Sequence, residues 1–360
     1  MCKPFHHRRS LHCILPPYLL SRIVENGSPA QRQAALRGLL VDSTVRLVRA
    51  SIAGPVAGTA ARRRNAAGMA PASGPRRTIR DAQHGTQAPG LVVRRREGEP
   101  PSGDAAVDEA YDGLGATFDL YWQVYARNSI DDAGLPLDAT VHYEKNYDNA
   151  FWDGTQMVFG DGDEQLFQRF TSAVDVIGHE LTHGVTEKEA GLVYFNQPGA
   201  LNESISDVFG SLVKQRLLAQ SAAEADWLIG AGLFTAAIKG TALRSMIEPG
   251  TAYDDPILGK DPQPDHMDKL VTTTEDNGGV HINSGIPNRA FALAARAIGG
   301  NAWDGAGRIW YHALLDPATT TNTDFAGFAR ITRDVAGRLF GPLSPEVAAV
   351  TAGWRTVGVT

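Results

Sequence analysis

The sequence predicts an α+β protein with two lobes, of which the first is rich in β-strands and the second is helical. Short apolar runs separated by Gly, Asp and Asn dominate residues 78–161, whereas patterns of helical period dominate from residue 167 to the end. The chain has 360 residues, which exceeds the ~250–300 residues at which a single core stops growing. It is therefore long enough for two lobes with separate cores.

Residues 10–23, SLHCILPPYLLSRI, follow two arginines and look like an interrupted export signal. A signal peptide needs an apolar core of about 7–15 residues and a cleavage site of small residues. Pro16 and Pro17 interrupt this core, and Arg22 and Glu25 close it. We therefore expect no conventional signal peptide and no membrane span, with a location in the cytoplasm or release by an unconventional route.

A helical pattern follows at residues 21–50, and residues 51–75 then change abruptly to Ala, Gly, Pro and Arg without periodicity. Such a composition is typical of an exposed linker that a protease can cut. One further helix is expected at 104–126, among the strands of the first lobe. The predicted organisation is an N-terminal segment (1–50), a linker with a processing site (51–75), an N-terminal lobe (76–188) and a C-terminal helical lobe (189–360).

Charge and cysteine content exclude several classes of protein. The net charge of −6 gives no overall attraction to nucleic acid or to an anionic membrane. Arginine runs at 62–64 and 94–96 are local, and they lack the aromatic platform of a nucleic-acid-binding module. Only Cys2 and Cys13 occur, so the body of the protein has no disulfide framework.

The segment AVDVIGHELTHGVTEKEAG, residues 173–191, joins the two lobes and carries candidate metal ligands. On a helix, His179, Glu180 and His183 lie on one side, opposite an apolar stripe. Histidines at positions i and i+4 can both bind one Zn²⁺ at about 2.0–2.1 Å, and a Glu beside the metal suits a general base. The alternative is an amphipathic helix whose histidines only pair with neighbouring side chains.

Residues 199–214, GALNESISDVFGSLVK, form a second helical pattern with two faces. Glu203 on its polar face could complete a His₂Glu site and leave the fourth position open for water. Asp207, one turn further on, could accept the spare ring N–H of a histidine ligand and fix its tautomer. Asn202, like Asp207, is assigned to the residues that support the metal ligands without binding the metal.

These motifs closely resemble those of the thermolysin family of zinc endopeptidases. His179-Glu-Leu-Thr-His183 is followed, after 19 residues, by Glu203 within NESISD. Further matches are YDNAFWDGTQMVFGDGD (147–163), AGLVYFNQ (190–197), LRSM (243–246) and EDNGGVHINSGIPN (275–288). The resemblance covers about residues 76–360 and implies a two-lobed thermolysin-like fold with the zinc-binding helix between the lobes. The N-terminal segment resembles the short propeptide of the protealysin subgroup, mainly through PPY at 16–18.

The resemblance also implies a role for each matching residue. His281 and Tyr194 would hydrogen-bond the oxyanion of the tetrahedral intermediate, and Asp276 would orient His281. Substrate would lie as an added strand, paired with Asn149 and with the backbone of Ala150. Arg244 would hold one of its carbonyl groups. The primed-side pocket would be apolar, which implies cleavage on the amino side of bulky hydrophobic residues; its lining residues are Phe167, Phe170, Val176 and Leu243.

The function implied is that of a zinc-dependent endopeptidase made as a zymogen, with one catalytic Zn²⁺. Glu180 would activate a zinc-bound water for attack on the peptide carbonyl. We expect a monomer whose partners are protein or peptide substrates and its own propeptide, and neither nucleic acid nor membrane.

Pro16 and Pro17 fix an extended backbone that could lie in a peptide cleft and resist cleavage. Cys13 could supply a thiolate as a fourth zinc ligand in the precursor; an incidental cysteine is the alternative.

The family's double calcium site is expected to be absent. Of the acids that would form it, only Asp175 and Asp226 remain, whereas the other positions hold Lys214, Leu228, Ala231 and Gly232. Ca²⁺ takes 6–8 oxygen ligands, so this set would serve it poorly. We expect the ammonium group of Lys214 to pair with Asp175 and to supply the missing positive charge.

Two other functions compete with this interpretation. A zinc aminopeptidase also uses two histidines and a more distant Glu, but it needs an acidic anchor for the free amine of its substrate, and no such motif occurs. A self-capped binding protein without activity would keep its N-terminal segment in the cleft permanently. The presence of every catalytic position argues against the second function.

Overall fold

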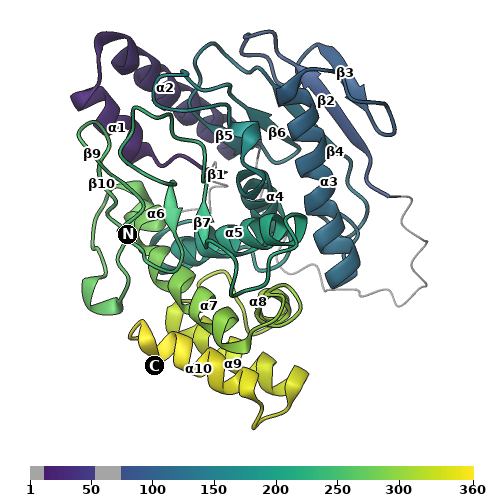
Figure 1. Cartoon of the computed structure of the whole chain (residues 1–360), viewed down its shortest axis with the longest axis vertical. Coiled ribbons are helices and arrows are strands. Elements are labelled where there is room, and N and C mark those ends of the chain that lie inside the picture. The colour runs from purple at the N-terminus through teal and green to yellow at the C-terminus, as the bar shows by residue number, and fades with distance from the viewer. Residues whose placement is uncertain (1–11, 53–73) are drawn as a thin grey trace, which may run out of the picture.

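The structure is a computed structural model that describes residues 12–52 and 74–360. Strands and one long helix form the first lobe, and helices form the second, as the sequence predicts (Figure 1). Two helices lie side by side where the lobes meet: α4 (Val174–Lys188) and α5 (Asn196–Leu217). They pack closely at Gly210, where a Cβ atom would come within 2.3 Å of the Asp175 carbonyl oxygen, so only glycine fits there.

A six-stranded mixed sheet forms the first lobe, with the order β1-β5-β6-β4-β2-β3. The pairs β2–β4 and β4–β6 are parallel and the other pairs are antiparallel. One edge strand, β1, comes from the N-terminal segment. The strands are β1 (His12–Cys13), β2 (Arg77–Asp81), β3 (Val92–Arg96), β4 (Leu137–Val141), β5 (Ala150–Trp152) and β6 (Gln156–Phe159).

The helix predicted at 104–126 is confirmed as α3 (Ala105–Tyr125). Asp104 caps its first turn by accepting hydrogen bonds from the backbone N–H groups of Ala106 and Val107. Ala126 ends the helix in a left-handed conformation, with φ of 54°. The buried face of α3 packs against β2, β4 and α4, so this helix supports the metal-binding helix from the side of the sheet.

The C-terminal lobe is less uniformly helical than the sequence pattern suggests. Between α5 and residue 275 the chain forms short strands and turns, and glycines and prolines recur throughout this stretch. These elements are β7 (Leu228–Ile229), β8 (Arg244–Ser245), β9 (Asp254–Asp255), β10 (Gly259–Lys260) and the 3₁₀ helix η2 (Met267–Lys269). The remaining helices are η1 (Phe170–Ser172), α6 (Asp276–Asn283), α7 (Gly285–Ile298), α8 (Ala306–Leu314), α9 (Phe325–Phe340) and α10 (Pro345–Thr356).

The N-terminal segment forms two helices instead of the one pattern predicted at 21–50, namely α1 (Pro17–Asn26) and α2 (Pro29–Ile52). They divide at Gly27 and Ser28, where Ser28 N–H donates to the Gln31 side chain over 2.8 Å and so favours a new helix start. Because α2 continues to Ile52, it takes the first two residues of the predicted linker. Residues 53–73 of that linker lie outside the described residues.

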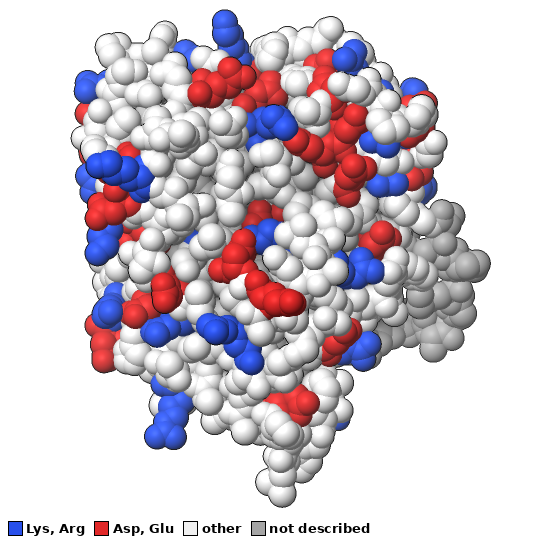
Figure 2. Space-filling model, in the orientation of Figure 1, with Lys and Arg blue, Asp and Glu red and all other residues white. Residues whose placement is uncertain are grey.

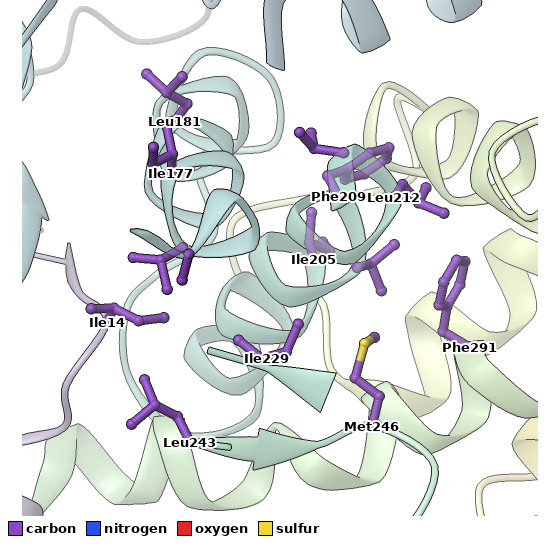
Figure 3. Packing of buried hydrophobic residues seen from close by; sticks show 14 of the residues in the cluster. Ile14, Ile177, Leu181, Ile205, Phe209, Leu212, Ile229, Leu243, Met246 and Phe291 are labelled. Atoms are coloured by element: carbon purple, nitrogen blue, oxygen red, sulfur yellow. The ribbon is translucent and has the colours of Figure 1, made fainter. Parts of the chain in front are cut away.

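One large core cluster contains residues from both lobes and from the N-terminal segment. Ile14 and Leu15 are fully buried in it, and Figure 3 shows Ile14 in the same group of side chains as Leu243 and Ile177. On the face drawn in Figure 2, acidic and basic residues are interspersed and form no large patch of one sign. Among the described residues, no helix combines the length and apolar character that a membrane crossing requires.

Candidate active site

Three buried side chains meet between α4 and α5. His179 and His183 come from α4 and Glu203 comes from α5, and one ligand atom of each lies within 4.8 Å of the others. The Nε2 atoms of the two histidines are 3.0 Å apart, and each lies 3.5 Å from a carboxylate oxygen of Glu203. The structure thus brings together the three metal ligands that the sequence predicts.

Protein groups hold the other ring nitrogen of each histidine. His179 Nδ1 lies 2.8 Å from Asp207 Oδ1, and His183 Nδ1 lies 2.8 Å from Asn202 Oδ1. Both residues assigned from the sequence to a supporting role therefore contact a histidine ligand. With Nδ1 protonated and donating, both Nε2 atoms present lone pairs to the same point, as metal-ligating histidines do.

This donor set fits Zn²⁺. Two imidazole nitrogens and one carboxylate are the protein ligands of a catalytic zinc site with one open position. Two facing lone pairs 3.0 Å apart repel each other unless a cation lies between them. Glu203 Oε2 is buried, and among the described residues it has no hydrogen-bond partner, so it is available to a metal.

Glu180 is fully buried beside these ligands. Its Oε2 atom accepts a hydrogen bond of 3.2 Å from the Trp152 backbone N–H, while Oε1 has no hydrogen-bond partner among the described residues. Burial raises the pKa of Glu180 well above its usual value, and the neighbouring carboxylate of Glu203 adds to this effect. A carboxylate with one unsatisfied oxygen and a raised pKa is suited to accept a proton.

Tyr194 and His281 lie next to the metal ligands. Tyr194 Oη is 3.2 Å from His281 Nε2, and it also donates a hydrogen bond to Glu203. Asp276 accepts from His281 twice, from the ring Nδ1 at 2.6 Å and from the backbone N–H at 2.9 Å. Burial lowers the pKa of His281, but the charges of Asp276 and Glu203 outweigh this effect and raise it.

Residues 12–15 occupy the edge that was assigned to substrate. Strand β1 pairs antiparallel with β5, and Ile14 N–H donates to the Ala150 carbonyl over 3.3 Å. Leu15 N–H donates to Asn149 Oδ1 over 3.1 Å. The Ile14 carbonyl accepts from Arg244 over 3.2 Å, so all three residues with predicted substrate-holding roles contact this segment.

Cys13 presents its carbonyl oxygen to the site, 3.2 Å from His281 Nε2. Its side chain belongs to a small apolar cluster with Tyr143, Tyr147, Phe151 and Val158. The group of potential metal ligands among the described residues does not include it. Thiolate ligation by Cys13 therefore stays a prediction.

The sequence did not predict that one carboxylate joins the metal ligand to the substrate clamp. Asp207 Oδ2 accepts from Arg244 Nε, and Oδ1 accepts from the terminal nitrogen NH2, both over 2.8 Å. Asn288 also donates to Asp207 over 2.8 Å. Asp207 and Arg244 are 37 residues apart, and the chain between them is not one regular helix or strand. Their contact therefore could not be predicted from helical or strand spacing.

The four residues assigned to the primed-side pocket are all buried in the main core cluster: Phe167, Phe170, Val176 and Leu243. The rings of Phe167 and Phe170 lie 5.9 Å apart. The side chain of Ile14 is fully buried in the same cluster.

Lys214 forms the ion pair predicted from the sequence. Its Nζ atom lies 3.0 Å from Asp175 Oδ2 and 2.9 Å from Asp226 Oδ1, and it donates to the Leu228 carbonyl over 2.6 Å.

Comparisons with known proteins agree with this geometry. The family models described as thermolysin metallopeptidase, catalytic domain and thermolysin metallopeptidase, alpha-helical domain match residues 73–187 and 190–359. An extracellular metalloprotease of Pectobacterium carotovorum subsp. carotovorum is 52% identical over 98% of this chain and 97% of its own length. Protease PrtS of a Photorhabdus species is 48% identical over 96% of this chain and 91% of its own length. The solved structure of the precursor of protealysin, a metalloproteinase from Serratia proteamaculans, has 53% identity and a TM-score of 0.87, covering 97% of this chain and all of that one.

These relatives contradict the location expected from the sequence. The Pectobacterium protein is named an extracellular metalloprotease, and an extracellular minor metalloprotease of Serratia marcescens is 45% identical over 81% of this chain. The expectation of a cytoplasmic location or an unconventional route was wrong, because it relied only on the interruption of an apolar run by two prolines.

Proposed function

The chain belongs to the thermolysin family of metallopeptidases and is a zinc metalloendopeptidase, and from this premise we propose how its residues divide the work. Glu180 is the general base that activates the attacking water, and His281 and Tyr194 stabilise the charge that develops on the substrate carbonyl. The buried, unpartnered Oε1 atom of Glu180 beside the metal ligands is the observation that carries this proposal.

His179, His183 and Glu203 would hold Zn²⁺, which when bound would act as a Lewis acid toward the carbonyl and would lower the pKa of water. Glu180 takes a proton from the water and passes it to the leaving nitrogen. Its raised pKa supports the second transfer, because a more basic carboxylate keeps the proton until the nitrogen can accept it. Tyr194 and His281 each place a donor where the oxyanion forms, an arrangement worth about 2.7–4 kcal/mol per donor in other enzymes.

Bulky hydrophobic residues are the preferred primed-side residues in this proposal. The side chain of Ile14 supports it, because Ile14 takes the strand position whose carbonyl contacts Arg244 and is buried in the cluster that contains Leu243. Burying an aliphatic side chain of this size contributes about 1.5–3 kcal/mol. A polar side chain at the same position would lose this contribution and leave its own groups unpaired.

The N-terminal segment acts as a propeptide that blocks the cleft in a secreted precursor. We assign residues 1–50 to it and place the processing site in residues 51–75, ahead of the lobes at 76–188 and 189–360. The mature enzyme works as a monomer on protein or peptide substrates, with one zinc ion and without the double calcium site. The protealysin precursor supports the zymogen assignment, since that solved structure matches 97% of the present chain, including most of its N-terminal segment.

Replacement of Glu180 by Gln tests the role of the general base. We expect Glu180→Gln to keep one zinc ion per chain and to lose hydrolysis of casein by about 10²–10⁴-fold. Glu164→Gln is the matched control, because it makes the same substitution at an exposed residue to which we assign no part in the reaction. Zinc content by mass spectrometry and initial rates on casein are measured for both variants. Activity of Glu180→Gln near that of the control would disprove the assignment.

A further inference from the structure

We propose that the active site cuts the Cys13–Ile14 peptide bond of its own chain, within the same molecule. This inference rests on the proposed function and names one peptide bond as a substrate of that site. Self-cleavage is a more specific claim than blockage of the cleft, because a segment can block a cleft in many registers and directions. Only one register and one direction place a bond for hydrolysis.

The backbone of residues 12–15 runs in a single defined register. His12 pairs with Trp152 and Cys13 pairs with Phe151 in the antiparallel ladder of β1 and β5. Beyond the ladder, Ile14 N–H donates to the Ala150 carbonyl over 3.3 Å, and Leu15 N–H donates to Asn149 Oδ1 over 3.1 Å. The segment therefore lies as an added strand along the edge proposed for substrate, not as a loop that crosses it.

Two consecutive carbonyl groups identify the bond that lies at the reacting position. The Cys13 carbonyl oxygen lies 3.2 Å from His281 Nε2, the atom proposed to face the developing oxyanion. The next carbonyl, of Ile14, accepts from Arg244 over 3.2 Å. The carbonyl that faces His281 is thus that of Cys13, and the nitrogen bonded to it is that of Ile14.

The side chains agree with this register. Ile14 is fully buried in the core cluster that contains the primed-side residues, including Leu243 (Figure 3). Pro16 and Pro17 lie beyond Leu15, so the bond at the reacting position contains no proline. The resistance to cleavage expected from these prolines therefore does not extend to the Cys13–Ile14 bond.

The proposed step is a hydrolysis that needs no co-reactant other than water. Water oxygen bonds to the Cys13 carbonyl carbon, and the bond from this carbon to the Ile14 nitrogen breaks. Glu180 carries a water proton to that nitrogen, so Ile14 becomes a new amino terminus and Cys13 a new carboxyl terminus. Helices α1 and α2 stay covalently joined to residue 14, so this cut frees residues 1–13 but does not by itself remove the helices.

The test uses the full chain, purified with a chelator and then supplied with Zn²⁺. Intact mass and amino-terminal sequencing are followed over time, with casein hydrolysis measured in parallel. We expect a product that begins at Ile14 and a peptide of residues 1–13, formed with a first-order rate constant that does not change over a tenfold range of protein concentration. Glu180→Gln should form neither product.

Two variants at one position test the register. Ile14→Val keeps an aliphatic side chain, and we expect cleavage within about threefold of the wild-type rate. Ile14→Asp places a charge in an apolar cluster, and we expect cleavage after residue 13 to slow at least tenfold. Circular dichroism of both variants checks that the rest of the chain remains folded.

The outcomes separate this inference from the function on which it rests. Casein hydrolysis by a chain whose Cys13–Ile14 bond stays intact would overturn the self-cleavage and leave the peptidase in place. A first cut at another bond, or a first-order rate constant that rises in proportion to protein concentration, would overturn it as well. A zinc-loaded chain that cuts neither itself nor casein would overturn both.

Discussion

Lys214 Nζ lies 3.0 Å from Asp175 Oδ2, and this ion pair joins α5 to the first turn of α4. Only 8% of the surface of Lys214 is exposed. Burial lowers the pKa of this ammonium group, but the charges of Asp175 and Asp226 outweigh burial and raise it. The lysine therefore stays charged and neutralises the carboxylates of Asp175 and Asp226.

The first prediction concerns calcium. We expect the melting temperature of the wild type to be the same with and without millimolar Ca²⁺ at fixed zinc, because an ammonium group already neutralises Asp175. Lys214→Glu should lower the stability by about 3–5 kcal/mol without Ca²⁺, since it leaves a buried carboxylate unpaired. Part of this loss should return with Ca²⁺, because three carboxylates would then converge.

Differential scanning calorimetry in a Glu180→Gln background measures these changes without self-digestion. Lys239→Glu is the control, because Lys239 is exposed and its replacement changes the net charge equally. A large stabilisation of the wild type by Ca²⁺ would contradict the prediction and show that a calcium site survives.

A second prediction concerns Asp276, which accepts hydrogen bonds from the ring and the backbone N–H of His281. Asp276→Asn removes the charge that holds the ring, and we expect kcat to fall by about 10²-fold, close to the loss of one oxyanion donor. KM should change little, because the substrate edge is intact. Asn is a suitable replacement, since Asp276 has φ of 50° and Asn tolerates the left-handed region.

Rates on a short peptide substrate, measured from pH 5 to pH 9, check this prediction. The basic limb of the wild-type profile should move to lower pH in the variant, because a positive His281 is less favoured without the carboxylate. Asp268→Asn, at an exposed acid, is the control. A variant that loses only stability and keeps kcat and the profile would show that Asp276 has no positioning role.

The metal ligands could be predicted from the sequence because they depend on local geometry. His179 and His183 are four residues apart, about one turn, so they lie on the same side of α4 once that segment is helical. Glu203 lies on α5, and the packing of α5 against α4 brings it to the two histidines. The ion pair of Lys214 and Asp175 could be predicted for a different reason. Most acids of the family's double calcium site are missing from this sequence, so Asp175, which remains, needs another cation beside it.

The orientation of Cys13 could not be predicted, because it depends on strand register. A shift of one residue in β1 turns every side chain to the other face of the sheet, and nothing in residues 10–23 alone fixes that register. In the structure the Asn149 and Arg244 contacts fix it, and both come from distant parts of the chain. The role of Asp207 as a partner of Arg244 escaped prediction for the same reason.

A third prediction follows from the contacts of Asp207. Asp207→Asn keeps the size of the side chain but removes the charge that neutralises Arg244 and orients His179. We expect zinc affinity to fall by about 10–100-fold and stability to fall by about 3–5 kcal/mol, because Arg244 stays buried without a counter-charge. Competition with a chelator gives the affinity and urea unfolding gives the stability. Unchanged zinc affinity would contradict the link between the clamp and the metal ligand.

The last prediction concerns pH and His142, which bridges two acids. Its Nδ1 lies 2.8 Å from Asp161 Oδ2, and its Nε2 lies 3.0 Å from Asp104 Oδ2 at the start of α3. The hydrogen bond to Asp161 raises the pKa of His142 to about 9, against burial, which lowers it. His84 and Arg94 also lie close to these carboxylates, at 3.5 and 3.7 Å.

Because the folded pKa exceeds the unfolded value of about 6.5, protonated His142 stabilises the fold fully below pH 6.5. This stability is lost as the pH rises through about 9. His142→Asn should therefore cost about 1–2 kcal/mol at pH 6, less than the whole shift because water screens a half-buried pair, and almost nothing at pH 10.

Urea unfolding at both pH values in the Glu180→Gln background measures the difference. His84→Asn is a matched control, because His84 has φ of 59° and His142 has φ of 52°, so Asn meets the same backbone conformation at both positions. His84 is 56% exposed and should contribute little at either pH. An equal cost of His142→Asn at pH 6 and pH 10 would mean that this side chain acts through packing, because only a contribution from its charge disappears when the ring loses its proton.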